Sequence, residues 1–285
     1  MDIKTLGVVG CGLMGSGIAE IFARASTTVV VHEVDTSAAA GGRSRIETSL
    51  RRAVSSGRIS ADDAERALAR ISIDVDLEAL AGADLVIEAA SEDEDLKVEL
   101  FRRLDQVVTD RNAILASNTS SVPIMKLGTV TSRPSQVVGM HFFNPVPVLP
   151  LVEIVPSLLT SGQTLERVQR VAQDLGKTVI RAQDRAGFIV NALLVPYLLS
   201  AIRMVESGFA SAADVDAGMV NGCAHPMGPL HLADLIGNDT VAAIAASMYA
   251  EFKEPLLAPP PLLMRMVDAG LLGRKSGRGF FDHAG

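Results

Sequence analysis

Three glycines near the N-terminus have the spacing that a phosphate-binding turn needs. Gly10, Gly12 and Gly15 form a G-x-G-x-x-G pattern after a short apolar run, and a segment with helical character follows. In such a turn the first glycine permits a tight bend, the second lets the backbone approach a pyrophosphate, and the third allows close helix–strand packing. The N–H groups of Leu13 and Met14 would then face the phosphates. The segment predicts a dinucleotide site, although a glycine turn alone can be structural.

A carboxylate at the end of the next apolar run favours NAD over NADP. Glu33 lies 23 residues after Gly10, near the spacing of about 20 that is expected for the residue that binds the ribose hydroxyls. Its charge would repel a 2′-phosphate, and no arginine occurs between Glu33 and Gly42. Asp35 is a competing candidate for this role, and Glu33 has the simpler interpretation of a solvated strand end. We predict that the cofactor is NAD.

Three further polar segments follow apolar runs in the middle of the chain. They are residues 117–121, residues 141–145 and Glu153 within residues 151–155. Ligands of open α/β sheets bind at the carboxyl ends of strands, which is where these segments are expected to lie. Each also has a simpler interpretation, because a Ser/Thr run can be a turn, His141 a hydrogen-bonded core residue, and Glu153 a surface residue.

The elements that must position these residues alternate between short strands and helices. Strands are predicted at residues 6–10, 28–33, 85–88, 113–117, 137–141, 151–155 and 178–180, and helices at residues 18–25, 37–56, 61–69, 97–108 and 164–175. Short, buried strands between helices indicate a parallel, doubly wound sheet. The fold class of this part of the chain is therefore α/β.

After about residue 184 the sequence changes character. Residues 188–205 are apolar on nearly every side, and further helices are expected at residues 212–220, 230–249 and 262–269. A helix that is apolar all round needs cover on all sides, which a domain of this size supplies only in part. We predict a cofactor-binding domain over residues 1–184 and a helical domain over residues 185–285, which forms a homodimer.

Composition excludes several classes of protein. Hydrophobic residues make up 48% and charged residues 21% of the chain, which excludes a disordered or collagen-like protein. The net charge of −7 argues against nucleic acid and anionic membrane surfaces as partners. Only two cysteines are present, which favours a reducing, cytoplasmic location. Glycines and polar residues interrupt the apolar stretches at 6–19 and 188–202, so neither a signal peptide nor a membrane span is expected.

Six motifs along the chain resemble the L-3-hydroxyacyl-CoA dehydrogenase family, particularly its stand-alone bacterial 3-hydroxybutyryl-CoA members. They are GCGLMGSGIAE at 10–20, ASNTSS at 116–121, HFFNPVPVLPLVE at 141–153, GFIVNALLVPYL at 187–198, HPMGPL at 225–230 and GRKSGRGFF at 273–281. The resemblance covers essentially the whole chain. It implies a Rossmann-type NAD domain, a helical dimerisation domain, and interconversion of (3S)-3-hydroxyacyl-CoA and 3-oxoacyl-CoA with short acyl chains.

The resemblance also implies four catalytic residues. His141 falls on the family's catalytic histidine and Glu153 on its partner glutamate, while Ser117 and Asn191 fall on the active-site serine and asparagine. Histidine can remove and return the hydroxyl proton near neutral pH. A carboxylate on the other ring nitrogen would fix the tautomer and stabilise the imidazolium. The two neutral side chains could hold the 3-oxygen or the thioester carbonyl as charge builds, and no metal is expected.

Further residues match ligand contacts of the family. The cofactor contacts beyond the glycine turn fall on Glu92, Lys97, Ser117, Asn144 and Lys275. The acyl-CoA contacts fall on Ser49, Arg52 and Ser117. Asn144 has the alternative role of shaping the turn before Pro145. Glu92 lies in an acidic run, and Arg52 in a basic group on a helix, and either could simply face solvent.

Two other functions stay open at this point. A dehydrogenase of the same fold could act on a hydroxy acid without CoA, such as a sugar acid, and competition by free CoA would distinguish it. A cofactor-binding structural protein without catalysis is the other, and an NADH-absorbance assay with acetoacetyl-CoA would decide. Neither the physiological direction nor the preferred chain length is encoded in a motif.

Overall fold

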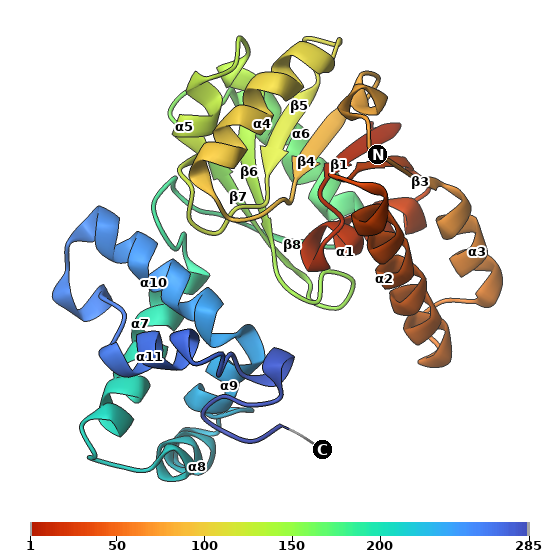
Figure 1. The fold of residues 1–285 in the computed structure, drawn as a ribbon. Coiled ribbons are helices and arrows are strands. Elements are labelled where there is room, and N and C mark those ends of the chain that lie inside the picture. The colour runs from red at the N-terminus through yellow and green to blue at the C-terminus, as the bar shows by residue number, and fades with distance from the viewer. Residues whose placement is uncertain (1, 284–285) are drawn as a thin grey trace. The chain divides into compact units, whose positions relative to one another are not determined.

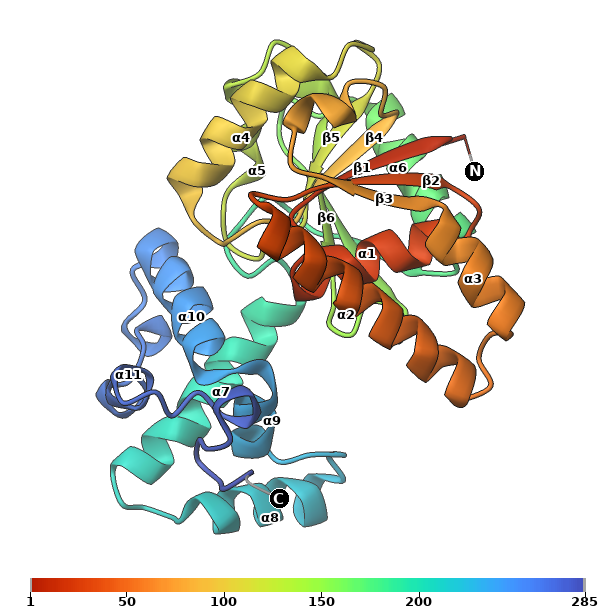
Figure 2. The ribbon, with the colours of Figure 1, turned by 45° about the vertical axis from the view of Figure 1, so that its right-hand side comes forward.

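A computed structural model describes residues 2–283, which form two compact units (Figures 1 and 2). The first unit ends at Asp184 and the second begins at Arg185. Each unit has its own hydrophobic core. No helix among the described residues is long and apolar enough to cross a bilayer.

The first unit is built on one sheet, in which the described residues place eight strands. The strands are β1 (Thr5–Val9), β2 (Thr28–His32), β3 (Ile71–Asp74), β4 (Leu85–Glu88), β5 (Ile114–Ser117), β6 (Val137–Phe142), β7 (Leu151–Pro156) and β8 (Thr178–Arg181). Their order is β3-β2-β1-β4-β5-β6-β7-β8. The strands from β3 to β6 are parallel, β7 is antiparallel to β6, and β8 is parallel to β7. The predicted mostly parallel, doubly wound sheet is confirmed.

The helices of this unit are α1 (Leu13–Arg24), α2 (Thr36–Ser55), α3 (Ala61–Ala69), α4 (Glu94–Val107), α5 (Ile124–Thr129) and α6 (Gly162–Asp174). Figure 2 shows α4 on the opposite side of the sheet from α1 and α6. Strand β3 and helix α5 were not predicted. Helix α4 begins three residues before the predicted start, because the Asp93 side chain accepts a hydrogen bond from the N–H of Leu96 and caps the helix.

Alternation along the strands determines which residues face α4. Ala116 of β5, Met140 of β6 and Ile154 of β7 all pack into the core that includes the buried side chains of α1 and α6. Successive side chains of a strand point to opposite faces. Ser117 follows Ala116, His141 follows Met140, and Glu153 precedes Ile154. These three side chains therefore point to the opposite face of the sheet.

The second unit contains α7 (Val190–Glu206), α8 (Ala212–Cys223), α9 (Pro229–Ile236), α10 (Asn238–Phe252) and α11 (Pro261–Asp268). The single helix predicted at residues 230–249 is wrong, because the chain is broken at Gly237 into α9 and α10. Gly237 has a φ of 105°, which side-chain-bearing residues rarely adopt. Helix α7 packs Val195, Leu198 and Ile202 into the core, whereas Leu193 on another side is 75% exposed.

Candidate active site

His141 and Glu153 form a buried, hydrogen-bonded pair on the sheet. Strands β6 and β7 are antiparallel, and their register sets His141 directly opposite Glu153. Directly opposed residues lie on the same face of a sheet, so the register brings the two side chains together. Nδ1 of His141 lies 2.7 Å from Oε2 of Glu153, and the side chains are 6% and 0% exposed. The carboxylate favours the tautomer with the proton on Nδ1 and with Nε2 as the acceptor.

Ser120 contacts the other ring nitrogen of His141. Its hydroxyl oxygen lies 3.1 Å from Nε2. The resemblance places the serine role on Ser117, but the Ser117 hydroxyl is buried and donates to Oε2 of Glu88 at 2.6 Å. The parallel register of β4 and β5 sets Ser117 beside Glu88, which explains this contact. The serine whose hydroxyl contacts the His141 ring is therefore Ser120, and not Ser117 as predicted.

The turn after β5 carries Ser120 to the histidine. Strand β5 ends at Ser117, and the Asn118 side chain then accepts a hydrogen bond from the N–H of Phe142 at 2.9 Å. This contact ties the turn to the strand that carries His141. The motif at residues 116–121 contains three serines, and its spacing does not show which hydroxyl reaches the ring.

The glycine turn has the shape that the G-x-G-x-x-G pattern predicts. Gly10 has a φ of 87°, and a Cβ on Gly15 would lie 1.9 Å from the carbonyl oxygen of Gly10. A Cβ on Gly12 would meet no heavy atom of the described residues within 4 Å. Gly12 precedes α1 and offers no side chain to cap the N–H groups of the first turn, to which Leu13 and Met14 belong. This open, uncapped helix start fits a pyrophosphate.

Glu33 and Asp35 have different roles in the structure. Oε1 of Glu33 accepts a hydrogen bond from the N–H of Cys11 at 2.5 Å, which places the carboxylate against the glycine turn. The Asp35 side chain instead accepts from the N–H of Ala38 at 2.8 Å and caps α2. Glu33 is therefore the better placed of the two for the ribose hydroxyls of a dinucleotide.

Replacing Glu33 by alanine is expected to raise the KM for NAD about 10- to 100-fold, because a hydrogen bond to a charged group contributes about 1.5–3 kcal/mol. The KM for the acyl substrate should change far less. Steady-state kinetics with each substrate varied in turn checks this. The variant Glu65→Ala removes an exposed carboxylate from α3 and serves as the control. An unchanged KM for NAD would remove Glu33 from the cofactor site.

Cys11 within the glycine turn is expected to be unreactive in the folded protein. Burial raises the pKa of its thiol to about 12, the charge of Glu33 adds to this rise, and Arg45 opposes it. The thiolate fraction at pH 8 is then about 10⁻⁴, and only the thiolate is an effective nucleophile. Cys223 is exposed. Iodoacetamide at pH 8, followed by mass spectrometry, should label Cys223 alone until denaturant is added, and rapid labelling of Cys11 would contradict this.

Lys97, predicted as a cofactor contact, is buried in an ion-pair cluster. Its ammonium lies 2.6 Å from Oε1 of Glu88 and 3.2 Å from Oε2 of Glu92, and its side chain is 1% exposed. Glu88 was not identified from the sequence, because it ends an apolar strand and belongs to no motif. The pKa of Glu92 is lowered, since Lys97 and the hydrogen bonds from residues 119–121 outweigh its burial, which alone raises the pKa.

Two of the predicted CoA contacts share a hollow with Asn144. The hollow has a volume of about 420 Å³ and is lined by Ser49 and Arg52 of α2, by Leu13 of α1 and by Asn144, among others. Because Leu13 is the first residue of α1, part of this hollow lies at the start of the helix that follows the glycine turn. The structure brings these residues together, although they come from three separate segments of the chain.

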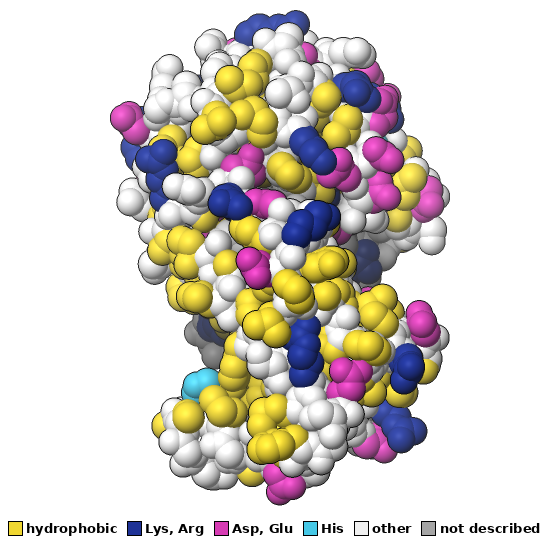
Figure 3. All heavy atoms as spheres, turned by 90° about the vertical axis from the view of Figure 1, so that its left-hand side faces the viewer, with side chains coloured by type: hydrophobic (Ala, Val, Ile, Leu, Met, Phe, Trp, Pro, Cys, Tyr) yellow, Lys and Arg dark blue, Asp and Glu magenta, His cyan; other side chains and the backbone are white. Residues whose placement is uncertain are grey.

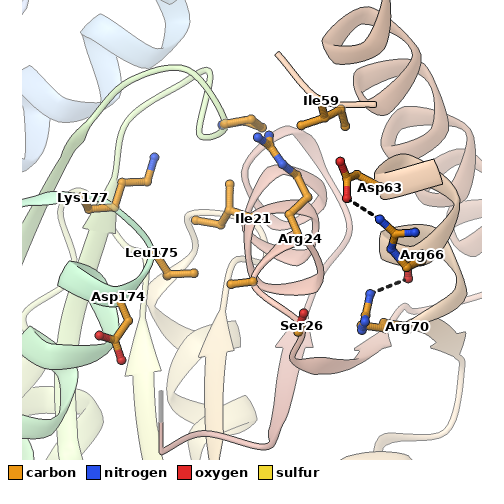
Figure 4. Close-up of a pocket in the computed structure, with 12 residues that line it drawn as sticks. Ile21, Arg24, Ser26, Ile59, Asp63, Arg66, Arg70, Asp174, Leu175 and Lys177 are labelled. Carbon is orange, nitrogen blue, oxygen red and sulfur yellow. Dashed lines mark hydrogen bonds and ion pairs between the residues drawn. The ribbon is translucent and has the colours of Figure 1, made fainter. Parts of the chain in front are cut away.

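A neighbouring hollow of about 360 Å³ contains Lys177 and Arg24 (Figure 4). The ammonium of Lys177 donates to the carbonyl oxygens of Val146 at 2.5 Å and Leu149 at 2.7 Å. Burial and the charge of Arg24 lower the pKa of Lys177. The two hydrogen bonds tie down the loop between β6 and β7, which also carries Asn144. Lys177 therefore stabilises one wall of the hollow that contains Ser49 and Arg52.

Two predicted site residues belong to the helical unit. Asn191 is buried in the first turn of α7. Lys275 is half-exposed and forms an ion pair with Asp239 at 2.5 Å. Their predicted contacts with substrate and cofactor stay predictions. Among the described residues, no group of three or more His, Cys, Asp or Glu side chains is arranged to hold a metal ion.

The sheet order, the glycine turn and the carboxylate against it define a Rossmann-type, NAD-binding oxidoreductase with a helical second unit. Residues 5–185 match the model of the 3-hydroxyacyl-CoA dehydrogenase NAD binding domain, and residues 187–283 match that of the C-terminal domain. The chain therefore belongs to the 3-hydroxyacyl-CoA dehydrogenase family, and its cofactor is NAD.

Close relatives extend over the whole chain. The chain is 56% identical over 282 residues to 3-hydroxybutyryl-CoA dehydrogenase of Mycobacterium tuberculosis, with 99% of each chain covered. The crystal structure of M. tuberculosis FadB2 matches with a TM-score of 0.97, 56% identity and coverage of 98% and 99%. That of (S)-3-hydroxybutyryl-CoA dehydrogenase PaaH1 from Ralstonia eutropha matches with a TM-score of 0.92, 43% identity and 99% coverage of each chain.

Proposed function

We propose that this protein interconverts (3S)-3-hydroxyacyl-CoA and 3-oxoacyl-CoA with short acyl chains, the C4 pair 3-hydroxybutyryl-CoA and acetoacetyl-CoA first among them. The observation that carries the proposal is the arrangement of Glu153, His141 and Ser120 in a chain that belongs to this family. The names of the full-length relatives support the choice of a four-carbon substrate.

In this mechanism His141 moves the proton of the 3-hydroxyl group. Nε2 accepts that proton when the alcohol is oxidised, and the imidazolium returns it when the ketone is reduced. Glu153 on Nδ1 holds the ring orientation and stabilises the imidazolium. The Ser120 hydroxyl, next to Nε2, is placed to hold the 3-oxygen as its charge changes. The dinucleotide would supply the nicotinamide ring that takes the hydride from C3 during oxidation, while the protein provides orientation and proton transfer.

The residues of the first unit fit the two ligands. The glycine turn at Gly10, Gly12 and Gly15 and the Glu33 carboxylate would hold the dinucleotide. We assign part of the CoA chain to the hollow that contains Ser49 and Arg52, because Arg52 is a cation suited to a phosphate group. We further propose a catalytic role for Asn191, as the family resemblance implies.

The direct test is an NADH-absorbance assay with acetoacetyl-CoA, followed by the same assay on thioesters of four to sixteen carbons. We expect the highest kcat/KM with the four-carbon substrate and with NADH over NADPH. Acetoacetate without CoA should be a poor substrate, and free CoA should compete with the thioester. Equal rates with the free acid would instead indicate a dehydrogenase of a non-CoA hydroxy acid.

The helical unit is proposed to form a homodimer. Leu193, Phe209 and Leu256 are 75%, 78% and 72% exposed, and Figure 3 shows hydrophobic side chains across the face of this unit that is turned to the viewer. Large apolar surfaces of this kind mark interfaces between proteins. Light scattering at micromolar concentration should give twice the chain mass of 30.0 kDa, and a stable monomer would reject the proposal.

The proposed location is the cytoplasm. Cys11 and Cys223 are both free thiols in the structure, which agrees with a reducing compartment. Immunodetection in fractionated cells tests this, and recovery in a secreted fraction would contradict it.

A further inference from the structure

Beneath the active-site serine lies a cluster of three charged side chains. Lys97 of α4 places its ammonium 2.6 Å from Glu88 at the end of β4 and 3.2 Å from Glu92. Glu88 and Lys97 are almost fully buried, whereas the Glu92 side chain is 35% exposed. The proton-transfer mechanism proposed above uses none of these three residues.

Glu92 organises the segment that carries Ser120. Its Oε1 accepts hydrogen bonds from the N–H groups of Ser120 at 2.8 Å and Ser121 at 3.0 Å. The same oxygen also accepts from the hydroxyls of Thr119 at 2.5 Å and Ser121 at 2.8 Å. One carboxylate oxygen is thus the common acceptor for three consecutive residues. The Ser120 hydroxyl, held at the centre of this segment, lies 3.1 Å from Nε2 of His141.

Glu88 fixes the preceding part of the same segment. Its Oε2 accepts from the Ser117 hydroxyl at 2.6 Å, and its Oε1 accepts from the N–H of Ala90 at 2.7 Å. Because Lys97 contacts both carboxylates, the end of β4, the start of α4 and the turn after β5 form one connected network. Networks of this kind hold a functional side chain in a fixed rotamer.

We propose that Glu92, itself held by the buried Lys97, is a positioning residue that directs the Ser120 hydroxyl at Nε2 of His141. This inference rests on the proposed function and assigns Glu92 and Lys97 a role at the proton-transfer site, beyond the cofactor contact that the sequence resemblance implies. Glu92 acts through Ser120, so the two residues form one functional unit.

Glu92 is the suitable member of the cluster for substitution. Its removal leaves Lys97 paired with Glu88, whereas removal of Lys97 would leave Glu88 buried without its cation, and such a variant is expected to fold poorly. Glu94→Ala is the matched control, because Glu94 lies two residues after Glu92, in the first turn of α4, and its carboxylate pairs with Lys126 at the surface.

The decisive experiment is a double-mutant cycle on kcat for acetoacetyl-CoA reduction. Ser120→Ala should lower kcat about 10²-fold, as the loss of one preorganised donor does. Glu92→Ala should lower kcat about 10- to 100-fold through misplacement of the hydroxyl, and Glu92→Gln, which keeps an acceptor oxygen, should lower it less. In the Ser120→Ala background, Glu92→Ala should have little further effect, since residues that act as a unit are not additive.

The KM for NAD separates positioning from cofactor binding. In Glu92→Ala we expect kcat to fall by a larger factor than the KM for NAD rises, because the loss of position of the Ser120 hydroxyl acts on the chemical step. Multiplicative effects of the two substitutions, or an unchanged kcat with a raised KM for NAD, would overturn the proposal. Glu94→Ala should resemble the wild type in all of these measurements.

A readout without substrate keeps the inference testable if the proposed function fails. In ¹⁵N spectra of the imidazole groups, the Nε2 resonance of His141 is assigned by its loss in His141→Gln. It should move in the same direction in Glu92→Ala and in Ser120→Ala, and should not move in Glu94→Ala. Wild-type inactivity on acetoacetyl-CoA would reject the substrate, whereas an unmoved Nε2 resonance in Glu92→Ala would reject the positioning role.

Discussion

The variant His141→Gln is expected to lower kcat for acetoacetyl-CoA reduction by at least about 10²-fold, the low end of the contribution of general acid–base catalysis. Glutamine fills similar space and can hydrogen-bond, but its amide does not take up or release a proton near neutral pH. The KM for NADH should change little, because the glycine turn and Glu33 are untouched. Steady-state kinetics in both directions measures the effect.

His225→Gln is the matched control for this substitution. His225 lies in the helical unit, where its ring contacts the Tyr197 hydroxyl at 3.2 Å. Its loss should leave kcat within about threefold of the wild type, as is usual away from catalytic groups. Near-normal turnover in His141→Gln would contradict the assignment of His141 as the proton-transfer group. A loss of the folded state in that variant, visible in circular dichroism, would require His141→Asn in its place.

The second large effect is expected for Glu153→Gln. The Glu153 carboxylate is 0% exposed and contacts Nδ1 at 2.7 Å. A glutamine amide can donate to Nδ1, which favours the tautomer with the proton on Nε2, the nitrogen that must accept the substrate proton. We expect kcat to fall about 10²- to 10⁴-fold, and the upper end is the loss that the equivalent Asp→Asn change causes in a Ser–His–Asp triad.

Non-additivity tests whether Glu153 acts through the histidine. In the His141→Gln background, Glu153→Gln should cause no further loss of kcat, because the carboxylate then has no imidazolium to stabilise. The single variant should keep its far-ultraviolet circular dichroism spectrum, since glutamine preserves the buried volume. Turnover of Glu153→Gln close to the wild-type rate would contradict the pairing. So would an equal fold loss of kcat from Glu153→Gln in the wild-type and His141→Gln backgrounds.

The family resemblance predicted the pair at residues 141 and 153, and the sheet register explains why the two side chains meet. Both residues lie in short apolar runs joined by a Pro-rich loop, and the resemblance pairs them by type. The structure adds that β6 and β7 are antiparallel and that the two residues are directly opposed. A shift of one residue would move one side chain to the other face of the sheet. The burial of Met140 and Ile154 in the core on the other face opposes that shift.

Elsewhere, a single backbone position or a side-chain contact decided what the sequence predicted wrongly or left open. The apolar pattern of residues 230–249 is that of one helix, yet Gly237 adopts a left-handed conformation and divides it. Asp35 and Glu33 are equivalent in charge and nearly equivalent in spacing. Only the side-chain contacts in the structure show that Asp35 caps α2 and that Glu33 lies against the glycine turn.

The amino-acid order alone was sufficient for the glycine turn, the α/β class, the helical C-terminal part and the family, because each depends on periodicity or on motifs within short stretches. The spatial arrangement decided that Ser120, and not Ser117, contacts His141. It also decided that Glu88, Lys97 and Glu92 form one cluster next to the segment that carries Ser120. These groups come from β4, α4 and the turn after β5, which become neighbours only through the order of strands in the sheet. Contacts between segments distant in the chain depend on three-dimensional packing, and no local pattern of residues records them.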